Sequence, residues 1–173
     1  MRSVGFDAIA TAHARVLILG TLPGVKSLEQ AEYYAHPRNS FWWIMGELAG
    51  AGPDLTYQHR LQHLKHSGIA LWDVCHAAKR AGSSDANILI ETVQPNNFNA
   101  FLSCHPRIEM ICFNGQEAEK LFRRMVLPLR AGIHAIPQRT LPSTSPAYAG
   151  ITREEKLSRW REVLAPFIHP SLR

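Results

Sequence analysis

The sequence is poor in cysteine. Its three cysteines, Cys75, Cys104 and Cys112, are widely spaced and form no C-x-x-C pair, which argues against a zinc ribbon and against a disulfide framework. The N-terminus also lacks the apolar core of a signal peptide. These absences predict a soluble protein of a reducing compartment, expected to be cytoplasmic (nucleoid-associated in a bacterium).

Motifs for nucleotide-triphosphate, dinucleotide, serine-hydrolase and metalloprotease chemistry are missing too. The chain has no G-x-x-x-x-G-K-[ST] loop, no G-x-G-x-x-G fingerprint, no G-x-S-x-G elbow and no H-E-x-x-H pair. Its nine histidines are scattered; His59 and His63 share a helix face without a carboxylate, which favours a solvated face over a metal site. No apolar run reaches membrane-spanning length. We therefore expect no metal, no cofactor and no membrane contact.

The composition fits a single globular domain spanning residues 1–173. Hydrophobic residues make up 46% of the chain and charged residues 19%, which argues against disorder. The formal net charge of +5 is compatible with an acidic partner such as nucleic acid, but basicity alone is a weak signal.

Buried apolar runs alternate with amphipathic stretches, which is the pattern of strands alternating with helices. Strands are predicted at residues 15–20, 68–74, 107–115 and 135–141. Helices are predicted at residues 41–49, 57–66, 95–104, 116–127 and after Thr152. Pro137 indicates an edge position or an irregular start for the fourth strand, and residues 79–87 are expected to form a polar loop. The fold class is then a three-layer α/β/α sandwich with a short, mostly parallel four-stranded sheet.

Right-handed crossovers between parallel strands bring the loops after the strands to one edge of the sheet. The polar segments in those loops are residues 23–39, residues 73–76, Asn114 and residues 143–145. A single cleft is therefore expected to collect most of the polar side chains discussed below.

Residues 32–43 concentrate more polar and aromatic chemistry than any other short stretch. Pro37 disfavours a helical backbone at His36, and either Asn39 or Ser40 is placed to cap the helix that follows. Core packing is the simpler interpretation of the aromatic residues inside that helix, but it explains less of the polar residues before it.

The expected cleft would hold an amide, aromatic rings, hydroxyl groups and backbone N–H groups. Amides match the donor and acceptor edge of a planar heterocycle, and aromatic rings stack on its face. Arginine, lysine, serine and threonine side chains around it suit contacts with phosphate.

Four segments resemble the uracil-DNA glycosylase superfamily and, within it, the hypoxanthine-DNA glycosylase (deoxyinosine glycosylase) branch. They are G-T-L-P-G at residues 20–24, Y-Y-A-H-P-R-N-S-F-W at 33–42, F-N-G at 113–115 and L-P-S-T-S-P-A at 141–147. The resemblance runs from about Val16 to Tyr148 and implies a cofactor-free DNA glycosylase.

Two positions depart from the superfamily pattern. Many members carry a catalytic Asp or Asn where this chain has Leu22, and others carry His where it has Leu141. By resemblance to the hypoxanthine branch, the catalytic amide is Asn39. An amide is a weak base, so Asn39 would orient a water molecule for attack on an oxocarbenium-like sugar, and slow chemistry is expected. The alternative role of Asn39 is a helix cap alone.

The resemblance also implies which residues bind the base. They are Leu22, Pro23, Gly24, Phe41, Trp42 and Asn114. The first loop would offer backbone N–H groups to a base carbonyl oxygen, and one of the two aromatic residues would stack on the flipped base. The asparagine would read the polar edge of the base or, alternatively, cap the helix that follows it.

A second set of residues is implied to contact DNA. They are Lys26, His36, Arg38, Ser143, Thr144, Ser145, Pro146 and Tyr148. The hydroxyl-rich loop would grip phosphate and enter the minor groove with a wedge formed by Pro146, Ala147 or Tyr148, unless it is an ordinary Ser/Pro turn. A loop-orienting role is the alternative for the histidine. Further attraction for phosphate would come from Lys79, Arg80 and Arg139, unless these remain solvated charges.

The sequence, read with this resemblance, therefore predicts a monomeric, monofunctional DNA glycosylase whose partner is DNA containing a deaminated base, with hypoxanthine as the expected base. No lysine in these motifs is placed as a Schiff-base nucleophile, so strand cleavage is not expected. Two alternatives stay open: a preference for uracil or another deaminated base, and a DNA- or nucleotide-binding module without catalysis.

Overall fold

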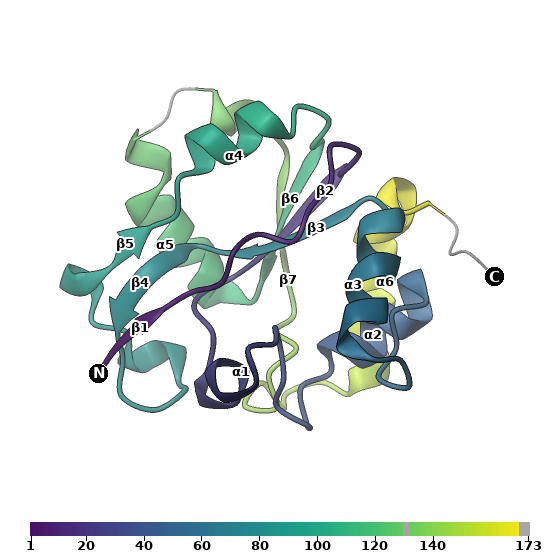
Figure 1. Cartoon of the computed structure of the whole chain (residues 1–173), viewed down its shortest axis with the longest axis horizontal. Coiled ribbons are helices and arrows are strands. Elements are labelled where there is room, and N and C mark those ends of the chain that lie inside the picture. The colour runs from purple at the N-terminus through teal and green to yellow at the C-terminus, as the bar shows by residue number, and fades with distance from the viewer. Residues whose placement is uncertain (130–131, 170–173) are drawn as a thin grey trace.

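A parallel sheet of four strands forms the centre of the computed structural model, which describes residues 1–129 and 132–169 (Figure 1). The strands are β2 (Val16–Gly20), β3 (Ile69–Asp73), β6 (Met110–Asn114) and β7 (Gln138–Leu141). They follow the order β3-β2-β6-β7. All four predicted strands are confirmed, and β7 lies at an edge of the sheet as Pro137 indicated.

Five helices cover the two faces of this sheet. They are α2 (Phe41–Ala49), α3 (Tyr57–His66), α4 (Phe98–Cys104), α5 (Gln116–Met125) and α6 (Arg153–Leu164). Successive residues of a strand point to opposite faces, so Leu17 and Leu19 pack with α4 and α5 whereas Val16 and Ile18 pack with α2, α3 and α6. Figure 1 shows the two helix groups on opposite sides of the sheet. The predicted three-layer α/β/α architecture is confirmed.

The helix ends follow the local capping chemistry. Helix α3 has the predicted bounds, with the Thr56 hydroxyl accepting from the His59 N–H. At the start of α6, the Thr152 hydroxyl accepts from the Glu155 N–H while the Glu155 carboxylate accepts from the Thr152 N–H, a complete capping box. None of the described helices has the length and apolar character needed to cross a membrane.

A second sheet, antiparallel and three-stranded, is absent from the sequence prediction. Its strands are β1 (Arg2–Val4), β4 (Cys75–Lys79) and β5 (Gln94–Pro95), in the order β1-β4-β5. The predicted turn at Cys75 and His76 is therefore wrong: these residues extend as a strand because the distant N-terminal segment pairs with them, Val4 opposite Ala77.

Several short elements complete the fold. Helix α1 (Val25–Gln30) forms where only a loop was predicted, and its N-cap Gly24 supplies no side-chain cap. The 3₁₀ turns are Asp85–Asn87, Ile90–Thr92, Leu127–Leu129, Ile133–Ala135 and Ala165–Phe167.

The loop after β4 fixes the loop after β2 through a buried arginine. The Arg80 side chain is only 1% exposed, and its guanidinium donates to the Leu22 carbonyl at 3.2 Å and to the Pro23 carbonyl. It also pairs with Asp85 at 3.2 Å, and the same carboxylate oxygen accepts from the Thr21 hydroxyl at 2.7 Å. The interpretation of Arg80 as a solvated or phosphate-attracting charge is wrong, because burial and four acceptors in and around the loop (the fourth is the Gly82 carbonyl) hold it inside.

Replacing Arg80 should therefore destabilise the fold. In Arg80→Leu, the two loop carbonyls lose their buried donor and the partly exposed Asp85 carboxylate loses its ion pair, so we expect about 3 kcal/mol less stability in urea unfolding. Arg123→Leu removes an exposed arginine paired with Glu119 and should cost less than about 1 kcal/mol. Equal losses in the two variants would contradict the structural role of Arg80.

Candidate active site

The carboxyl ends of three neighbouring strands define one edge of the sheet. Gly20 pairs with Asp73 across β2 and β3, and Leu19 pairs with Phe113 across β2 and β6. Because these strands are parallel, the loops that follow them emerge at the same edge, which we call the carboxyl edge. The predicted convergence of polar segments there is confirmed for Asp73 and Asn114 by this register.

Asn39 lies in a tight turn immediately before α2. Its N–H donates to the His36 carbonyl at 2.9 Å, and its amide oxygen accepts from the Phe41 N–H at 3.0 Å. Ser40 occupies the N-cap position but makes no side-chain cap, so the capping bond to the helix comes from Asn39. The half-buried amide keeps one oxygen lone pair, and its Nδ2 group has no hydrogen-bond partner among the described residues. Capping and a role toward a ligand are thus compatible.

His36 orients the same turn. Its Nδ1 accepts from the Arg38 N–H at 3.1 Å, so the neutral ring carries its single N–H on Nε2. This contact agrees with the loop-orienting alternative and leaves the Arg38 side chain exposed.

The loop after β7 is tied to this turn and to β6. The Ser40 N–H donates to the Thr144 carbonyl at 3.0 Å. Asn114 holds Thr144 twice, accepting from its N–H and donating to its hydroxyl, both at 2.9 Å. Thr144 is fully buried, so the prediction that it contacts DNA is wrong.

The same two hydrogen bonds occupy the side chain of Asn114. Its two polar atoms both serve Thr144, and the N-cap position of α5 belongs to Gly115 rather than to Asn114. The sequence analysis offered two roles for Asn114, a helix cap and a contact with the base. The structure shows a third: the amide oxygen and one amide N–H are hydrogen-bonded to Thr144 in the loop after β7.

Helix α6 supports the rest of this loop from beneath. The Trp160 indole N–H donates to the Pro142 carbonyl at 2.9 Å, and the Lys156 ammonium donates to the Ser145 carbonyl at 3.2 Å. Burial lowers the pKa of Lys156, whose ammonium also lies 5.3 Å from the centre of the Tyr148 ring. The loop is thus held rigidly with the Tyr148 side chain exposed.

The two serines of the loop use their hydroxyls to shape it. The Ser143 hydroxyl accepts from the Ser145 N–H, and the Ser145 hydroxyl accepts from the Ala147 N–H, both at 3.2 Å. Both serines and Pro146 are half-buried, so they keep some accessible surface, unlike Thr144.

The aromatic rings next to Asn39 pack against one another, with Tyr34 stacked on Phe41 and Phe41 edge-on to Trp42. Phe41 is fully buried and Trp42 is 4% exposed, with its indole N–H donating to the Tyr33 carbonyl. The Tyr34 ring covers Phe41, with ring centres 4.1 Å apart and an angle of 27° between the planes. Neither Phe41 nor Trp42 therefore presents an open ring face, whereas Tyr34 is only half-buried as a residue. The expected core packing of Trp42 is confirmed.

Tyr34 and Asp73 meet above Gly20. A methyl group built on Gly20 would lie 2.5 Å from Asp73 Oδ1 and 2.9 Å from the Tyr34 hydroxyl oxygen, so only glycine leaves room for both. The Tyr34 backbone is left-handed, with φ of 54°, which is strained for a residue with a side chain. Among the described residues, the buried Tyr34 hydroxyl and Asp73 Oδ2 have no hydrogen-bond partner. Buried polar atoms without partners commonly mark functional positions.

Burial also changes the acidity of this pair. It raises the pKa of Asp73 to about 7, with a further contribution from the negative charge of Asp85 and partial relief from Arg80. The pKa of Tyr34 is raised by burial and by the charge of Asp73, and Asn114 nearby offsets part of that. A pKa of about 7 would let Asp73 exchange a proton near neutral pH. No role was assigned to it from the sequence, although an acidic residue ending an apolar strand was the available signal.

The loop after β2, which contains Leu22, Pro23 and Gly24, turns the carbonyl groups of Leu22 and Pro23 toward the protein interior. Leu22 is 5% exposed and packs in the core, and the carbonyls of Leu22 and Pro23 face Arg80. Among the described residues the N–H groups of Leu22 and Gly24 make no hydrogen bond. That they contact a ligand stays a prediction.

The remaining basic residue of the predicted DNA-binding set lies on α1. Lys26 is exposed and pairs with Glu29 at 2.9 Å. No group of three or more His, Cys, Asp and Glu side chains within residues 1–129 and 132–169 is arranged to hold a metal ion.

Comparison with known proteins identifies relatives over most of the chain. A hypoxanthine DNA glycosylase of Methanosarcina acetivorans is 35% identical over 160 residues, which cover 92% of this chain and 96% of the relative. A hypoxanthine DNA glycosylase of Methanosarcina barkeri is 37% identical over 129 residues, 72% of this chain and 80% of the relative.

Structural comparison and the family profile agree with these relatives. A solution NMR structure of a Methanosarcina acetivorans protein, named as a proposed uracil DNA glycosylase, matches with a TM-score of 0.76 at 34% identity and covers 96% of this chain and 99% of that one. The sequence profile of the Uracil DNA glycosylase superfamily matches residues 6–167. The chain therefore belongs to the uracil DNA glycosylase superfamily.

Proposed function

We propose that this protein is a DNA glycosylase that flips hypoxanthine out of DNA and hydrolyses its bond to deoxyribose. The two Methanosarcina relatives carry that activity in their names. The observation that carries the proposal is the position, at one sheet edge, of the Asn39 turn, the Asp73 carboxyl group and the Tyr34 phenol; among the described residues, Asp73 Oδ2 and the Tyr34 hydroxyl have no hydrogen-bond partner. Such an edge can take a polar, planar ligand.

Asn39 would act on the attacking water. Its amide is fixed by the bond from the Phe41 N–H and by the turn that Ser40 ties to Thr144. A fixed amide oxygen accepts a hydrogen bond from water and aims the water at the anomeric carbon, without removing its proton. This role would account for hydrolysis by a chain that has Leu22 in the core where many members of the superfamily carry Asp or Asn.

Asp73 would read the base. Hypoxanthine presents a carbonyl oxygen beside a ring N–H, and a protonated carboxyl group offers one donor and one acceptor to that pair. The ionised form offers acceptors only, so it would repel the carbonyl oxygen. The raised pKa of Asp73 supports a neutral carboxyl group below about pH 7.

Tyr34 would stack on the base. Phe41 supports its ring from one side, so Phe41 and Trp42 contribute indirectly, as the layer beneath. Uracil presents the same carbonyl and ring N–H as hypoxanthine, so a preference for hypoxanthine rests on the room left beside this ring and on the relatives.

DNA contacts are proposed for the accessible residues at the same edge. They are Lys26, His36, Arg38, Ser143, Ser145, Pro146 and Tyr148. The rigid loop supported by α6 suits a role against the phosphate backbone, with exposed Tyr148 as the wedge. We also propose that residues 1–173 act as one domain, as a monomer and in the cytoplasm; the profile match over residues 6–167 supports the first of these.

A second candidate is a DNA-binding module without catalysis, which the buried Leu22 favours. Excision assays on otherwise identical duplexes that contain hypoxanthine, uracil or xanthine separate the candidates. We expect release of hypoxanthine at the highest rate and no strand cleavage before alkali is added. Release of no base would reject the glycosylase, and faster release of uracil would reject the proposed substrate.

Asn39→Ala should slow hypoxanthine excision about 10²-fold, the usual effect of losing one transition-state contact. Binding of the damaged duplex should stay nearly unchanged in a gel-shift titration. Asn39→Asp keeps the oxygen that accepts from the Phe41 N–H and can still orient water, so it serves as the matched control and should retain excision. Unchanged single-turnover rates in Asn39→Ala would remove Asn39 from the mechanism.

The rate of excision should depend on the protonation of Asp73. Since its pKa in the folded protein is about 7, we expect full activity below that pH and a decline as the pH rises through it. Asp73→Asn keeps a donor and an acceptor and should remove this decline, whereas Asp73→Ala should be slow at every pH.

Thermal unfolding provides an independent readout of the same group. The folded-state pKa lies above the ordinary value of 3.8, so ionisation favours the unfolded chain between those two values and stability falls as the pH rises from about 4 to about 7. Asp73→Asn should therefore raise the melting temperature at pH 8 and have little effect at pH 4. A pH profile identical to wild type in both measurements would contradict the role of Asp73.

A further inference from the structure

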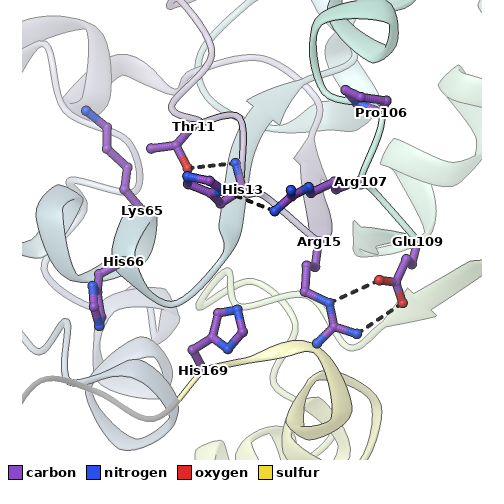
Figure 2. Close-up of a pocket in the computed structure, with 9 residues that line it drawn as sticks. All are labelled: Thr11, His13, Arg15, Lys65, His66, Pro106, Arg107, Glu109 and His169. Carbon is purple, nitrogen blue, oxygen red and sulfur yellow. Dashed lines mark hydrogen bonds and ion pairs between the residues drawn. The ribbon is translucent and has the colours of Figure 1, made fainter.

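A cavity of about 810 Å³ lies at the opposite edge of the parallel sheet, where the strands begin. Arg15 immediately precedes β2 and Glu109 immediately precedes β6, while Lys65 lies in the last turn of α3, ahead of β3. Figure 2 shows these side chains around one hollow together with Arg107, His13 and His169. Since parallel strands begin and end at opposite edges, this cavity faces away from the carboxyl edge.

The single acid among these residues is already neutralised. Glu109 receives two hydrogen bonds from the Arg15 guanidinium, at 3.0 and 3.1 Å, a bidentate pair that lowers the pKa of Glu109 and raises that of Arg15. The Arg15 guanidinium is further held by the Pro166 carbonyl at 3.3 Å. Glu109 is therefore ionised but compensated, and an anion entering the cavity meets no free carboxylate from it.

Two cations in the cavity remain without an acidic partner. Within residues 1–129 and 132–169, neither Lys65 nor Arg107 forms an ion pair. Arg107 donates one N–H to His13 Nδ1 at 3.1 Å, so the imidazole directs the guanidinium and keeps its own free N–H on Nε2 (Figure 2). Most of the N–H donors of these two residues are thus available to a ligand.

The donor chemistry suits a phosphate group. A guanidinium fork, an ammonium group and imidazole rings line this one cavity from segments far apart in the chain, and a phosphate group can accept hydrogen bonds from several donors at once. The volume lies within the range of small-molecule sites, so the cavity has room for a phosphate carried on a larger group.

We propose that this cavity is an anion site that binds phosphate groups and is separate from the carboxyl edge. The phosphate can come from a small phosphate compound or from the backbone of a second DNA segment held while the carboxyl edge is occupied. The proposal does not depend on the excision activity proposed above, because none of its residues belongs to that site.

The test is a titration of the protein, residues 1–173, with inorganic phosphate, monitored by NMR of the histidine side chains. We expect saturable shifts of the His13 and His169 imidazole signals. The double variant Lys65→Gln/Arg107→Gln should bind phosphate at least about tenfold more weakly, because it loses two charge-assisted donors. Lys120→Gln removes an exposed lysine on α5 that pairs with Glu117, and it should bind like wild type.

An undamaged duplex, added in place of phosphate, distinguishes the sources. Shifts of the same two imidazole signals identify backbone phosphate as a ligand, whereas a response to inorganic phosphate alone identifies small phosphate compounds; both outcomes support the site. Absence of saturable shifts with either probe, or equal affinity in the double variant, would overturn it. The double variant should unfold at the wild-type temperature and excise hypoxanthine at the wild-type rate, so a failure of the proposed enzymatic function is recognised separately.

Discussion

The two hydrogen bonds between Asn114 and Thr144 are the constraint on which the carboxyl edge depends. They join the end of β6 to the loop after β7, and the Thr144 carbonyl extends the connection to the turn before α2. Because Thr144 is fully buried, these bonds form away from competing water. The position of the Asn39 amide is consequently set by a residue more than a hundred positions later in the chain.

A second buried polar network complements this one. Arg80 holds the carbonyls of Leu22 and Pro23, and Asp85 bridges Arg80 to Thr21. The charge of Asp85 also contributes to the raised pKa of Asp73. The same acid thus stabilises the first loop and helps to keep the carboxyl edge uncharged, so the geometry and the acidity of the edge are linked.

The sequence predicts those elements of the fold that depend on residues close together in the chain. The apolar run of β2, the bounds of α3 and the capping box at Thr152 each follow from neighbouring residues. The antiparallel sheet does not, because the Cys-His-Ala-Ala-Lys segment of β4 has little strand preference of its own and is held in a strand by pairing with β1 and β5. Tertiary pairing decides that element.

The candidate site likewise has some features that local sequence predicts and others that depend on tertiary contacts. The cap that Asn39 supplies to α2 and the convergence of the strand ends could be predicted from local residues and topology, whereas the burial of Arg80 and the two hydrogen bonds between Asn114 and Thr144 could not. A charged residue in a polar loop is solvated in most proteins, and an asparagine at a strand end gives no sign of a partner thirty residues away. Asp73 was detectable as the acidic end of an apolar strand, but its acidity depends on three-dimensional neighbours.

The order of the strands has a consequence for biosynthesis. Central strand β2 pairs with segments that the ribosome makes roughly fifty and ninety residues later, and the loop that completes the carboxyl edge rests on Lys156 and Trp160 near the end of the described chain. Contacts between such distant segments close late in folding. During synthesis the carboxyl edge therefore stays incomplete until Lys156 and Trp160 have left the ribosome and packed beneath its last loop.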